Sequence, residues 1–399
     1  MEETRGSEVI SSQSHTDRLS NLPTRVDRWS QPLVMYKNYW LRPHMAGSIM
    51  LLENSFQARH DDTILVSSPK CGTTWLKALA FTITNRFRYD FEHHPLLSLH
   101  PHEVVPFIEI PFDKDLTYVE TLPSPRLLAT HMPFSLLPQS IVTSGCRIVY
   151  IARDPKDAFV SRWHFENKIH VGQDEIDLEA AFNMFCQGFS RYGPFWDHCL
   201  EYWRESIATP DKVLFMKYEN MMSEPVKHTI LLAQFLGVPF TEKEHEDRAP
   251  EAVTRLCSFE NLNGLQSNQM GNISMMGNVV LQKSAFFRRG KVGDWVNHLS
   301  QEMGRKLDLV IEEKLEGSGL YKRSLLNDQV TAAVEQLWEV AATVWHNRHS
   351  KCRHTVLTAA LWTIWKTRNA KAFENKDMTC SLMIRQCAAD IALWSHRCY

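Results

Sequence analysis

The stretch 64–77 constrains the fold of this chain more than any other part of the sequence. It starts with an apolar, β-prone run at 64–66, passes through a Pro-Lys-Cys-Gly turn, and continues into a helical pattern that begins at Thr73. The apolar face of that pattern carries Leu76, Leu79, Ala80 and Ile83. These features predict a buried strand, a tight loop and an amphipathic helix in direct succession.

The loop between this strand and helix has the composition of an anion-binding site. The free N–H groups and the dipole of a helix N-terminus attract anions. Gly72 lets the backbone approach a ligand closely, and Lys70 adds a positive charge. Thr73 and Thr74 add hydroxyl donors. The motif differs from a Walker A loop, in which the lysine follows the glycine, and a plain strand–turn–helix with a surface lysine is the alternative.

The composition indicates an ordinary globular protein. Of the 399 residues 44% are hydrophobic, and a net charge of −2 with a pI of about 6.8 argues against a general nucleic-acid binder. The nine cysteines form no CxxC pair, which suits a reducing compartment. Residues 1–18 lack the apolar core of a signal peptide, and no apolar run has membrane-spanning length. We therefore expect a cytoplasmic protein that binds neither nucleic acid nor membrane.

A second predicted strand ends in residues suited to binding phosphate. The run 147–152 leads to Arg153, and Asp154 and Pro155 then start a helix that reaches Ser161 two turns later. This spacing would let Arg153 and Ser161 share one phosphate. A surface Arg–Asp pair is the simpler alternative.

A histidine and a tyrosine follow two other predicted strands. The run 126–130 leads to His131 and a nearby proline, and the run 213–216 leads to Tyr218. Histidine titrates near neutral pH, so His131 is a candidate general base. Most histidines in such a position are structural, and the residue alone is a weak indicator.

Buried strands and helices alternate between residues 64 and 240, a pattern typical of a parallel α/β sheet. The predicted fold class is therefore α/β, with a central parallel sheet between helices. Ligands bind at the carboxyl ends of the strands in such sheets. The candidate residues that fall there are Lys70, His131, Arg153 and Tyr218.

Three further segments have loop-like sequences. Residues 91–122 are rich in histidine and proline, but the spacing fits no standard zinc site, so we expect a loop over a pocket. Residues 250–283 show little periodicity and predict a mobile loop. In the run 286–295, Arg288 and Arg289 precede two glycines, which suits a loop closing over a phosphate. A solvated basic turn, in which Asp294 could pair with the arginines, is the alternative for that run.

Four sequence blocks together resemble the cytosolic sulfotransferases, and in detail the plant branch of that family. The blocks are residues 68–75, 129–133, 150–157 with Ser161, and 287–295, within the range 29–325. One block would be suggestive, whereas four blocks in the family's order make a specific match. The resemblance implies a P-loop-like three-layer sandwich with a central parallel sheet.

The resemblance also implies a reaction. A sulfuryl group would move from 3′-phosphoadenosine 5′-phosphosulfate (PAPS) to a hydroxyl of a small acceptor, with 3′-phosphoadenosine 5′-phosphate (PAP) as product and no metal. His131 corresponds to the general base, and Lys70 to the cation that stabilises the leaving oxygen. The positions that correspond to PAPS-binding residues are Lys70, Cys71, Gly72, Thr73, Thr74, Trp75, Arg153, Ser161, Tyr218, Phe259, Arg288, Arg289 and Gly290.

The same resemblance divides these positions by role. Residues 70–74 correspond to the phosphosulfate site. The adenine site corresponds to Trp75, Tyr218 and Phe259, and the 3′-phosphate site to Arg153, Ser161, Arg288, Arg289 and Gly290.

The positions that depart from the family pattern are Cys71 for a common serine, Ala129 for the lysine of many animal members, and Arg289 for a common lysine. The animal-type dimer motif is not evident, so we expect a monomer.

The identity of the acceptor is what the sequence predicts least well. The pocket would be lined by residues from 29–45, 91–110, 255–285 and the segment after His131. Their aromatic residues and prolines suit a flat flavonoid, a steroid or a jasmonate-like molecule equally well, because pocket linings vary freely on one fold. The alternative function is a catalytically silent nucleotide-binding or scaffold protein of the same fold.

We expect the chain to have three parts. Residues 1–28 form a polar, disordered tail, residues 29–325 the sulfotransferase-like domain, and residues 326–399 an α-helical C-terminal appendage. Within the appendage, residues 361–373 resemble the segment between reverse transcriptase and RNase H in plant retroelements, which suggests a retroelement-derived extension. Its histidines and cysteine at 346–354 are not spaced to converge on a metal from one helix.

Overall fold

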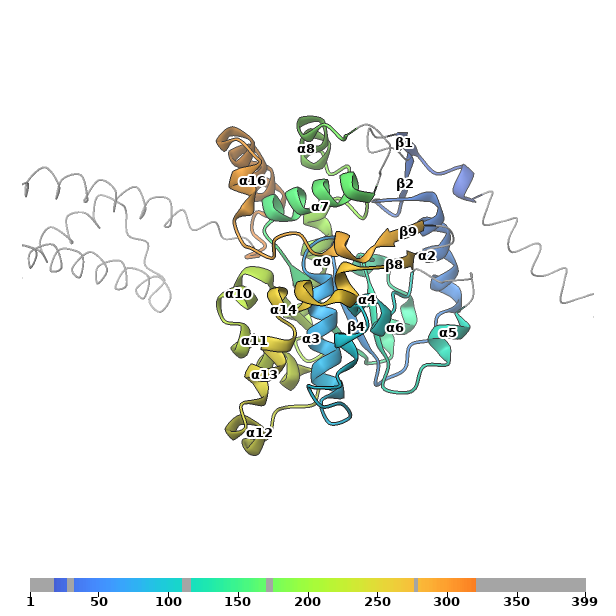
Figure 1. Ribbon diagram of the computed structural model, residues 1–399. Coiled ribbons are helices and arrows are strands. Elements are labelled where there is room, and N and C mark those ends of the chain that lie inside the picture. Colours follow the sequence, from blue (N-terminus) through green and yellow to red (C-terminus); the bar gives the residue numbers. More distant parts are fainter. Residues whose placement is uncertain (1–17, 27–31, 110–115, 170–174, 276–278, 321–399) are drawn as a thin grey trace, which may run out of the picture. The chain divides into compact units, whose positions relative to one another are not determined.

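The computed structural model describes residues 18–26, 32–109, 116–169, 175–275 and 279–320 (Figure 1). The chain divides into two units, Met1–Leu320 and Tyr321–Tyr399. The helical appendage expected at 326–399 lies outside the described residues, as do its histidines, and it stays a prediction.

A four-stranded parallel sheet forms the centre of the described fold (Figure 1). Its strands are β4 (Thr63–Ser67), β5 (Leu127–Thr130), β6 (Arg147–Ala152) and β7 (Val213–Lys217), in the order β5-β4-β6-β7. Leu65 of β4 is in register with Ala129 of β5 and with Val149 of β6. The predicted parallel α/β sheet is therefore confirmed.

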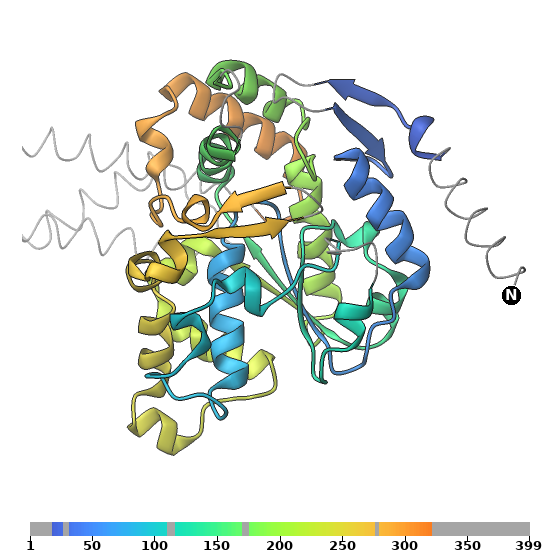
Figure 2. The same ribbon diagram turned by 45° about the vertical axis from the view of Figure 1, so that its right-hand side comes forward.

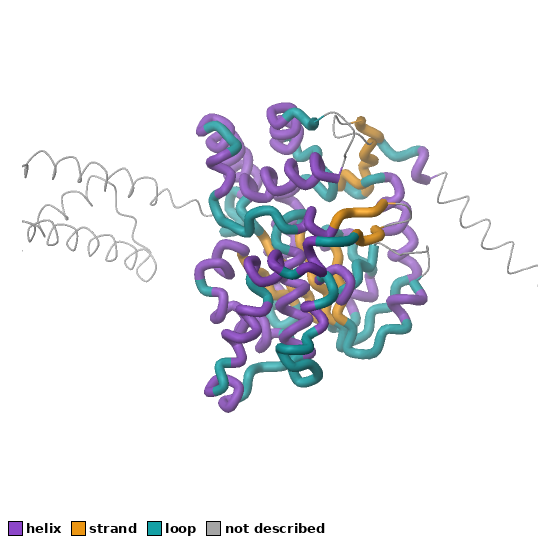
Figure 3. Tube along the Cα trace, in the orientation of Figure 1, coloured by secondary structure: helices purple, strands orange, loops and turns teal. Residues whose placement is uncertain are grey.

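Helices surround this sheet (Figure 3). Those before β7 are α2 (Pro43–Ser55), α3 (Thr73–Asn85), α4 (Pro101–Val104), α5 (Thr117–Glu120), α6 (Gln139–Thr143), α7 (Pro155–Ile169), α8 (Leu178–Cys186) and α9 (Phe195–Ala208). Those after it are α10 (Tyr218–Ser223), α11 (Pro225–Phe235), α12 (Glu242–Glu246), α13 (Ala249–Leu256), α14 (Phe259–Gly264), α15 (Gln266–Gln269) and α16 (Gln301–Leu315). The 3₁₀ turns are η1 (Pro95–Leu97), η2 (Phe134–Leu136), η3 (Lys283–Phe286) and η4 (Asp294–Asn297).

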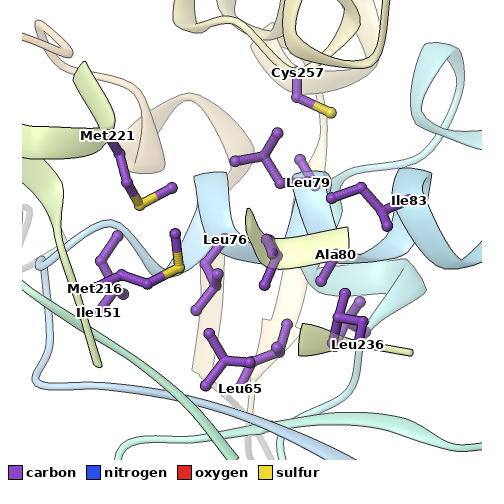
Figure 4. Packing of buried hydrophobic residues seen from close by; sticks show 14 of the residues in the cluster. Leu65, Leu76, Leu79, Ala80, Ile83, Ile151, Met216, Met221, Leu236 and Cys257 are labelled. Atoms are coloured by element: carbon purple, nitrogen blue, oxygen red, sulfur yellow. The ribbon is translucent and has the colours of Figure 1, made fainter. Parts of the chain in front are cut away.

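Side chains along the strands alternate between two helical layers. Figure 4 shows one face, where Leu65 and Ile151 of the sheet pack with the apolar side of α3 and with residues that follow α11 and α13. On the other face, the ring of Tyr150 stacks on Tyr202 of α9 with 4.4 Å between centroids. Helices thus cover both faces, and the three-layer arrangement is confirmed.

An antiparallel sheet of three short strands lies beside α2 (Figure 2). Its strands are β1 (Thr24–Val26), β2 (Pro32–Tyr36) and β3 (Tyr39–Leu41). Strand β1 lies inside the range 1–28, for which the sequence predicts disorder, so ordered structure begins before residue 29. Its pairing with β2 supplies backbone hydrogen bonds that no local pattern in the polar tail reveals.

The mobile loop expected at 250–283 is wrong for much of its length. The segment contains α13, α14 and α15, followed by a hairpin of β8 (Asn272–Met275) and β9 (Val279–Gln282). Side chains cap and tie these short elements: Ser258 Oγ accepts the N–H of Asn261 at 3.2 Å, and Asn268 Nδ2 donates to Leu262 O at 2.8 Å. Helices of four to eight residues are too short for their periodicity to show.

Replacing Leu65 by alanine is expected to lower the free energy of unfolding by about 2–5 kcal/mol, because the side chain is fully buried between β4 and α3 and leaves a cavity. Urea unfolding followed by circular dichroism measures the change. The control is Leu309→Ala on α16, where the side chain is 62% exposed and a change within about 0.5 kcal/mol is expected. Equal losses in both variants would contradict this picture of the core.

Candidate active site

Two left-handed residues shape the loop between β4 and α3. Lys70 has a φ of 71° and Gly72 a φ of 112°. A Cβ at position 72 would lie 3.0 Å from side-chain atoms of both Ile151 and Tyr218. The glycine therefore allows the loop to lie against the ends of β6 and β7, where a larger residue would collide.

A cavity of about 330 Å³ opens at the carboxyl ends of the parallel strands. Its lining contains every predicted site residue except one. These residues are Lys70, Gly72, Thr73, Thr74, Trp75, His131, Arg153, Ser161, Tyr218, Phe259, Arg288, Arg289 and Gly290. The fold thus brings together residues that are up to 220 positions apart in the sequence.

Cys71 is the exception among the predicted residues. Its side chain is fully buried and does not line the cavity. Its N–H donates to Ser68 O at 3.2 Å and so closes the turn. Burial also raises the pKa of the thiol well above its ordinary value. The side chain of Cys71 therefore supports the loop from behind, and a contact between its backbone and a ligand stays a prediction.

Positive charges gather around Lys70. Its ammonium lies 4.0 Å from the centroid of the Phe165 ring. Burial, and then the charges of Arg153 and Arg288, lower the pKa of Lys70 to about 7. A bound anion would favour the charged ammonium and raise that pKa again. The electrostatics of this end of the cavity therefore suit an anionic ligand.

Arg153 connects the loop at Lys70 with the basic run 287–295. Its guanidinium donates to Lys70 O at 3.3 Å and to Lys291 O at 3.0 Å, and it lies over the Tyr218 ring at 4.6 Å. The buried Nε of Arg288 has no hydrogen-bond partner among the described residues. A buried donor in this state is suited to an anion such as a phosphate.

Asp157 ties the basic run 287–295 to helix α7. Its carboxylate accepts the N–H of Gly293 at 2.7 Å and the N–H of Trp295 at 3.0 Å. The same run contacts α14, since a Cβ at Gly290 would collide with the Phe259 ring. The run is thus an ordered wall of the cavity. Asp294 also pairs with Arg288, as the alternative for this run expected, and the side chain of Arg289 stays largely exposed.

His131 follows β5, and its ring is held in one tautomer. Nδ1 lies 2.8 Å from Ser67 O, and because a carbonyl oxygen only accepts, Nδ1 carries the proton and Nε2 the lone pair. The backbone N–H of His131 donates to Glu109 Oε1 at 2.6 Å. Burial lowers the pKa of His131 well below its ordinary value. The ring is therefore neutral, as a proton acceptor must be.

Sequence reasoning missed a buried lysine beside the loop. Lys77 is fully buried, and its Nζ lies 2.9 Å from both His102 Nδ1 and Val105 O and 3.3 Å from the centroid of the Phe107 ring. His102 Nε2 lies 3.2 Å from Thr74 Oγ1. From the sequence, a lysine in a helical pattern is expected to be exposed to solvent. Lys77 is buried instead because its ammonium has partners in the segment 102–107, which the sequence does not place beside it.

Sequence reasoning also missed part of the cavity wall. The segments 29–45, 91–110 and 255–285 were expected to line the acceptor pocket, and each contributes to the lining. The segment after His131 was also expected there, but no residue between His131 and Arg153 lines the cavity. The unexpected contribution comes from α7 and the loop before α9. Its residues are Phe165, Ile169, Arg191 and Tyr192. No motif marks them, because their role follows from where α7 and α9 pack.

Two of the histidines considered as metal ligands cap helical turns. His94 Nδ1 accepts the N–H of Leu96 at 3.2 Å at the start of η1, and His100 Nδ1 accepts the N–H of His102 at 3.1 Å at the start of α4. Within the described ranges, no group of three or more His, Cys, Asp or Glu is arranged to hold a metal ion. In the same ranges, no helix has both the length and the apolar character needed to cross a bilayer.

Comparison with known proteins places this site in a family. A family model described as "Sulfotransferase domain" matches residues 60–319. The chain belongs to the sulfotransferase family. Among its relatives from Arabidopsis thaliana, cytosolic sulfotransferase 17 is 44% identical over 319 residues, covering 78% of this chain and 92% of the relative. Cytosolic sulfotransferase 5 is 42% identical over 310 residues, covering 76% and 94%. The predicted plant-type cytosolic family is confirmed, and the relatives' names agree with a cytoplasmic location.

Solved sulfotransferase structures have the same fold. An Arabidopsis thaliana putative steroid sulphotransferase matches with a TM-score of 0.60 at 34% identity, over 76% of this chain and 94% of that chain. Mouse sulfotransferase SULT7A1, solved in complex with PAP, matches with a TM-score of 0.56 at 25% identity, over 72% and 95%. The P-loop-like fold and the sulfotransferase activity expected from the sequence are therefore confirmed.

Replacing Gly290 by alanine is expected to lower the free energy of unfolding by about 2–4 kcal/mol. The added Cβ collides with the Phe259 ring, and the alanine must adopt the positive φ of 60° that the glycine has here. Urea unfolding followed by tryptophan fluorescence measures the loss. Gly271→Ala is the matched control: its φ is 83°, yet its Cβ meets nothing within 4 Å. There only the backbone cost of about 1 kcal/mol is expected. Similar losses at both positions would contradict the packing role of Gly290.

Proposed function

We propose that the chain transfers a sulfuryl group from PAPS to the hydroxyl of a small acceptor, with His131 as general base and Lys70 as the cation at the leaving oxygen. The observation that carries the proposal is the shared cavity: a neutral histidine with a free Nε2 lone pair and a cluster of cations line the same space. One side can accept a proton while the other stabilises negative charge.

We expect the donor at the cationic end of the cavity. Lys70, the hydroxyls of Thr73 and Thr74, and the N-terminus of α3 would hold the phosphosulfate. Arg153, Ser161 and Arg288 would hold the 3′-phosphate, together with Arg289 and Gly290 of the ordered basic run. The adenine would lie among the aromatic rings of Trp75, Tyr218 and Phe259, of which Trp75 and Tyr218 already form an edge-on pair at 5.5 Å.

The proposed reaction is one in-line displacement. His131 Nε2 takes the proton of the acceptor hydroxyl while the acceptor oxygen forms a bond to sulfur. The bond from sulfur to the bridging phosphate oxygen breaks, and Lys70 stabilises that oxygen as it keeps the electron pair. PAP and the sulfated acceptor leave. The cations of the cavity supply the positive charge that the transfer needs, so we expect the rate to be unchanged in EDTA.

The acceptor is proposed only as a class. Phe107, Phe165, Leu281 and Phe286 give the cavity apolar walls, and the Phe107 ring lies 4.8 Å from the His131 ring, centroid to centroid. Such walls suit a flat or alicyclic hydroxylated molecule, of the flavonoid, steroid or jasmonate-like kinds, and we propose that the enzyme acts as a monomer. The extension 326–399 lies beyond the matched residues 60–319, and its retroelement origin remains a proposal.

A panel assay tests the function. The full-length chain is given labelled PAPS, EDTA and flavonols, hydroxysteroids and hydroxyjasmonates. Transfer that survives EDTA supports the proposal. Tight PAP binding without transfer to any acceptor would favour the alternative of a catalytically silent protein with the same fold.

His131→Ala is expected to lower kcat by roughly 10²- to 10⁴-fold, because the acceptor proton then lacks a base within the cavity. Steady-state kinetics with saturating PAPS measure the change. The affinity for PAP, measured by calorimetry, should stay within about threefold, since the proposed donor contacts do not include His131. A kcat near the wild-type value would remove His131 from the mechanism.

The affinity for PAP is expected to fall above pH 7. Lys70 has a pKa of about 7 before the ligand binds, and the anion stabilises its charged form. Binding is therefore strongest below pH 7 and weakens by roughly up to tenfold per pH unit above it, until the raised pKa of the complex is reached. In Lys70→Arg the guanidinium stays charged, so calorimetry from pH 6.5 to 9 should give a flat profile. Parallel slopes in both proteins would exclude Lys70 as the titrating group.

A further inference from the structure

Two arginines line the cavity on the His131 side and have no part in the proposed donor site. Arg42 immediately precedes α2, and Arg191 lies in the loop before α9. Both line the same cavity as Lys70 and His131. Arg191 is next to Tyr192 in the chain, and the Tyr192 ring lies 5.6 Å from the His131 ring, centroid to centroid.

A buried carboxylate holds the two guanidinium groups together. Glu166 of α7 is 2% exposed. Its Oε1 lies 3.2 Å from Arg191 Nη2, and its Oε2 lies 3.4 Å from Arg42 Nη2. Glu166 itself does not line the cavity, whereas both arginines do. A ligand on this side therefore meets the guanidinium groups and not the acid that positions them.

One buried donor of Arg191 is available to a ligand. Its Nε is buried and has no hydrogen-bond partner among the described residues. A donor buried in this way is costly to leave unsatisfied. Arg191 lines the cavity, so a ligand with acceptor oxygens could satisfy it.

The charge of Arg191 reaches the surrounding groups. Burial, followed by the charges of Arg42 and Arg191, lowers the pKa of His44, which also lines the cavity. The Arg191 charge likewise adds to burial in lowering the pKa of His131 and adds to nearer charges in lowering that of Lys70. Glu166 offsets part of this charge at Lys70. The acceptor side of the cavity therefore offers guanidinium donors beside one buried carboxylate, which suits an acceptor with oxygen atoms better than a purely apolar one.

We propose that Arg191, with Arg42 beside it, forms an anion subsite for the acceptor, so that the acceptor carries a carboxylate in addition to the hydroxyl that receives the sulfuryl group. The inference rests on the proposed function and narrows its substrate class to hydroxylated carboxylic acids. A guanidinium recognises a planar carboxylate through paired N–H donors, and both bonds are charge-assisted. The carboxylate would be held against Arg191 while its hydroxyl faces His131 Nε2.

The test uses matched acceptors that differ only in charge. A 4-hydroxycinnamic acid and its primary amide have nearly the same shape and the same hydroxyl. With the full-length chain, the acid is expected to exceed the amide in kcat/KM by at least about tenfold, mainly through KM. In Arg191→Gln that preference should fall by roughly 10- to 100-fold, because the charge-assisted bonds are lost. The control is Arg305→Gln on α16, which is exposed, lies outside the cavity and should leave the preference unchanged.

Calorimetry measures the binding of the acid and of the amide to the PAP-loaded chain and requires no sulfate transfer. It therefore tests the carboxylate subsite separately from the proposed sulfotransferase function. Tighter binding of the acid that is lost in Arg191→Gln supports the subsite even where no sulfate is transferred, and a missing transfer then counts against the proposed function alone. Equal affinities for acid and amide, binding of neither, or a preference that survives Arg191→Gln would overturn the subsite.

Discussion

The close approach at Gly72 is the constraint on which the rest of the site depends. Because position 72 has no Cβ, the loop after β4 lies against Ile151 and Tyr218 at the ends of β6 and β7. That approach puts Lys70 O within reach of Arg153. Arg153 in turn contacts the basic run through Lys291 O. The conformation of this one loop thus brings together the ends of β4, β6 and β7 and the run 287–295. The side chains of Lys70, Arg153 and Arg288 line the cavity there.

Burial has the same electrostatic effect at both ends of the cavity, but with different chemical results. It lowers the pKa of Lys70 and that of His131, because water no longer stabilises the charged forms. An anionic ligand beside Lys70 would favour the charged ammonium and raise this pKa again. At His131 burial keeps the ring neutral, and the bond from Nδ1 to Ser67 O orients it with Nε2 available. The cavity lining therefore carries both a cation, Lys70, and a neutral imidazole with an available lone pair, His131.

Residues at strand ends were predictable because motif and topology agree. The loop at Lys70 and the ends of β5 and β6 carry polar residues in short, characteristic patterns, and a parallel sheet brings such ends to one edge. Residues whose role depends on packing were not predictable. Lys77 occupies an apolar helix face and has partners from 102–105. The short helices at 250–283 were missed because their caps and contacts, and not their period, make them ordered.

The sequence by itself determined the class of the sheet, the anion loop, the candidate base and the family, because each is encoded in residues that are close together in the chain. Tertiary structure alone decided which side chains share the cavity, that Cys71 stays behind its loop, and that Arg191 and Arg42 meet over Glu166. These arrangements depend on how α2, α7 and α9 pack around the sheet. Packing joins segments more than a hundred residues apart, and a one-dimensional pattern carries no record of such contacts.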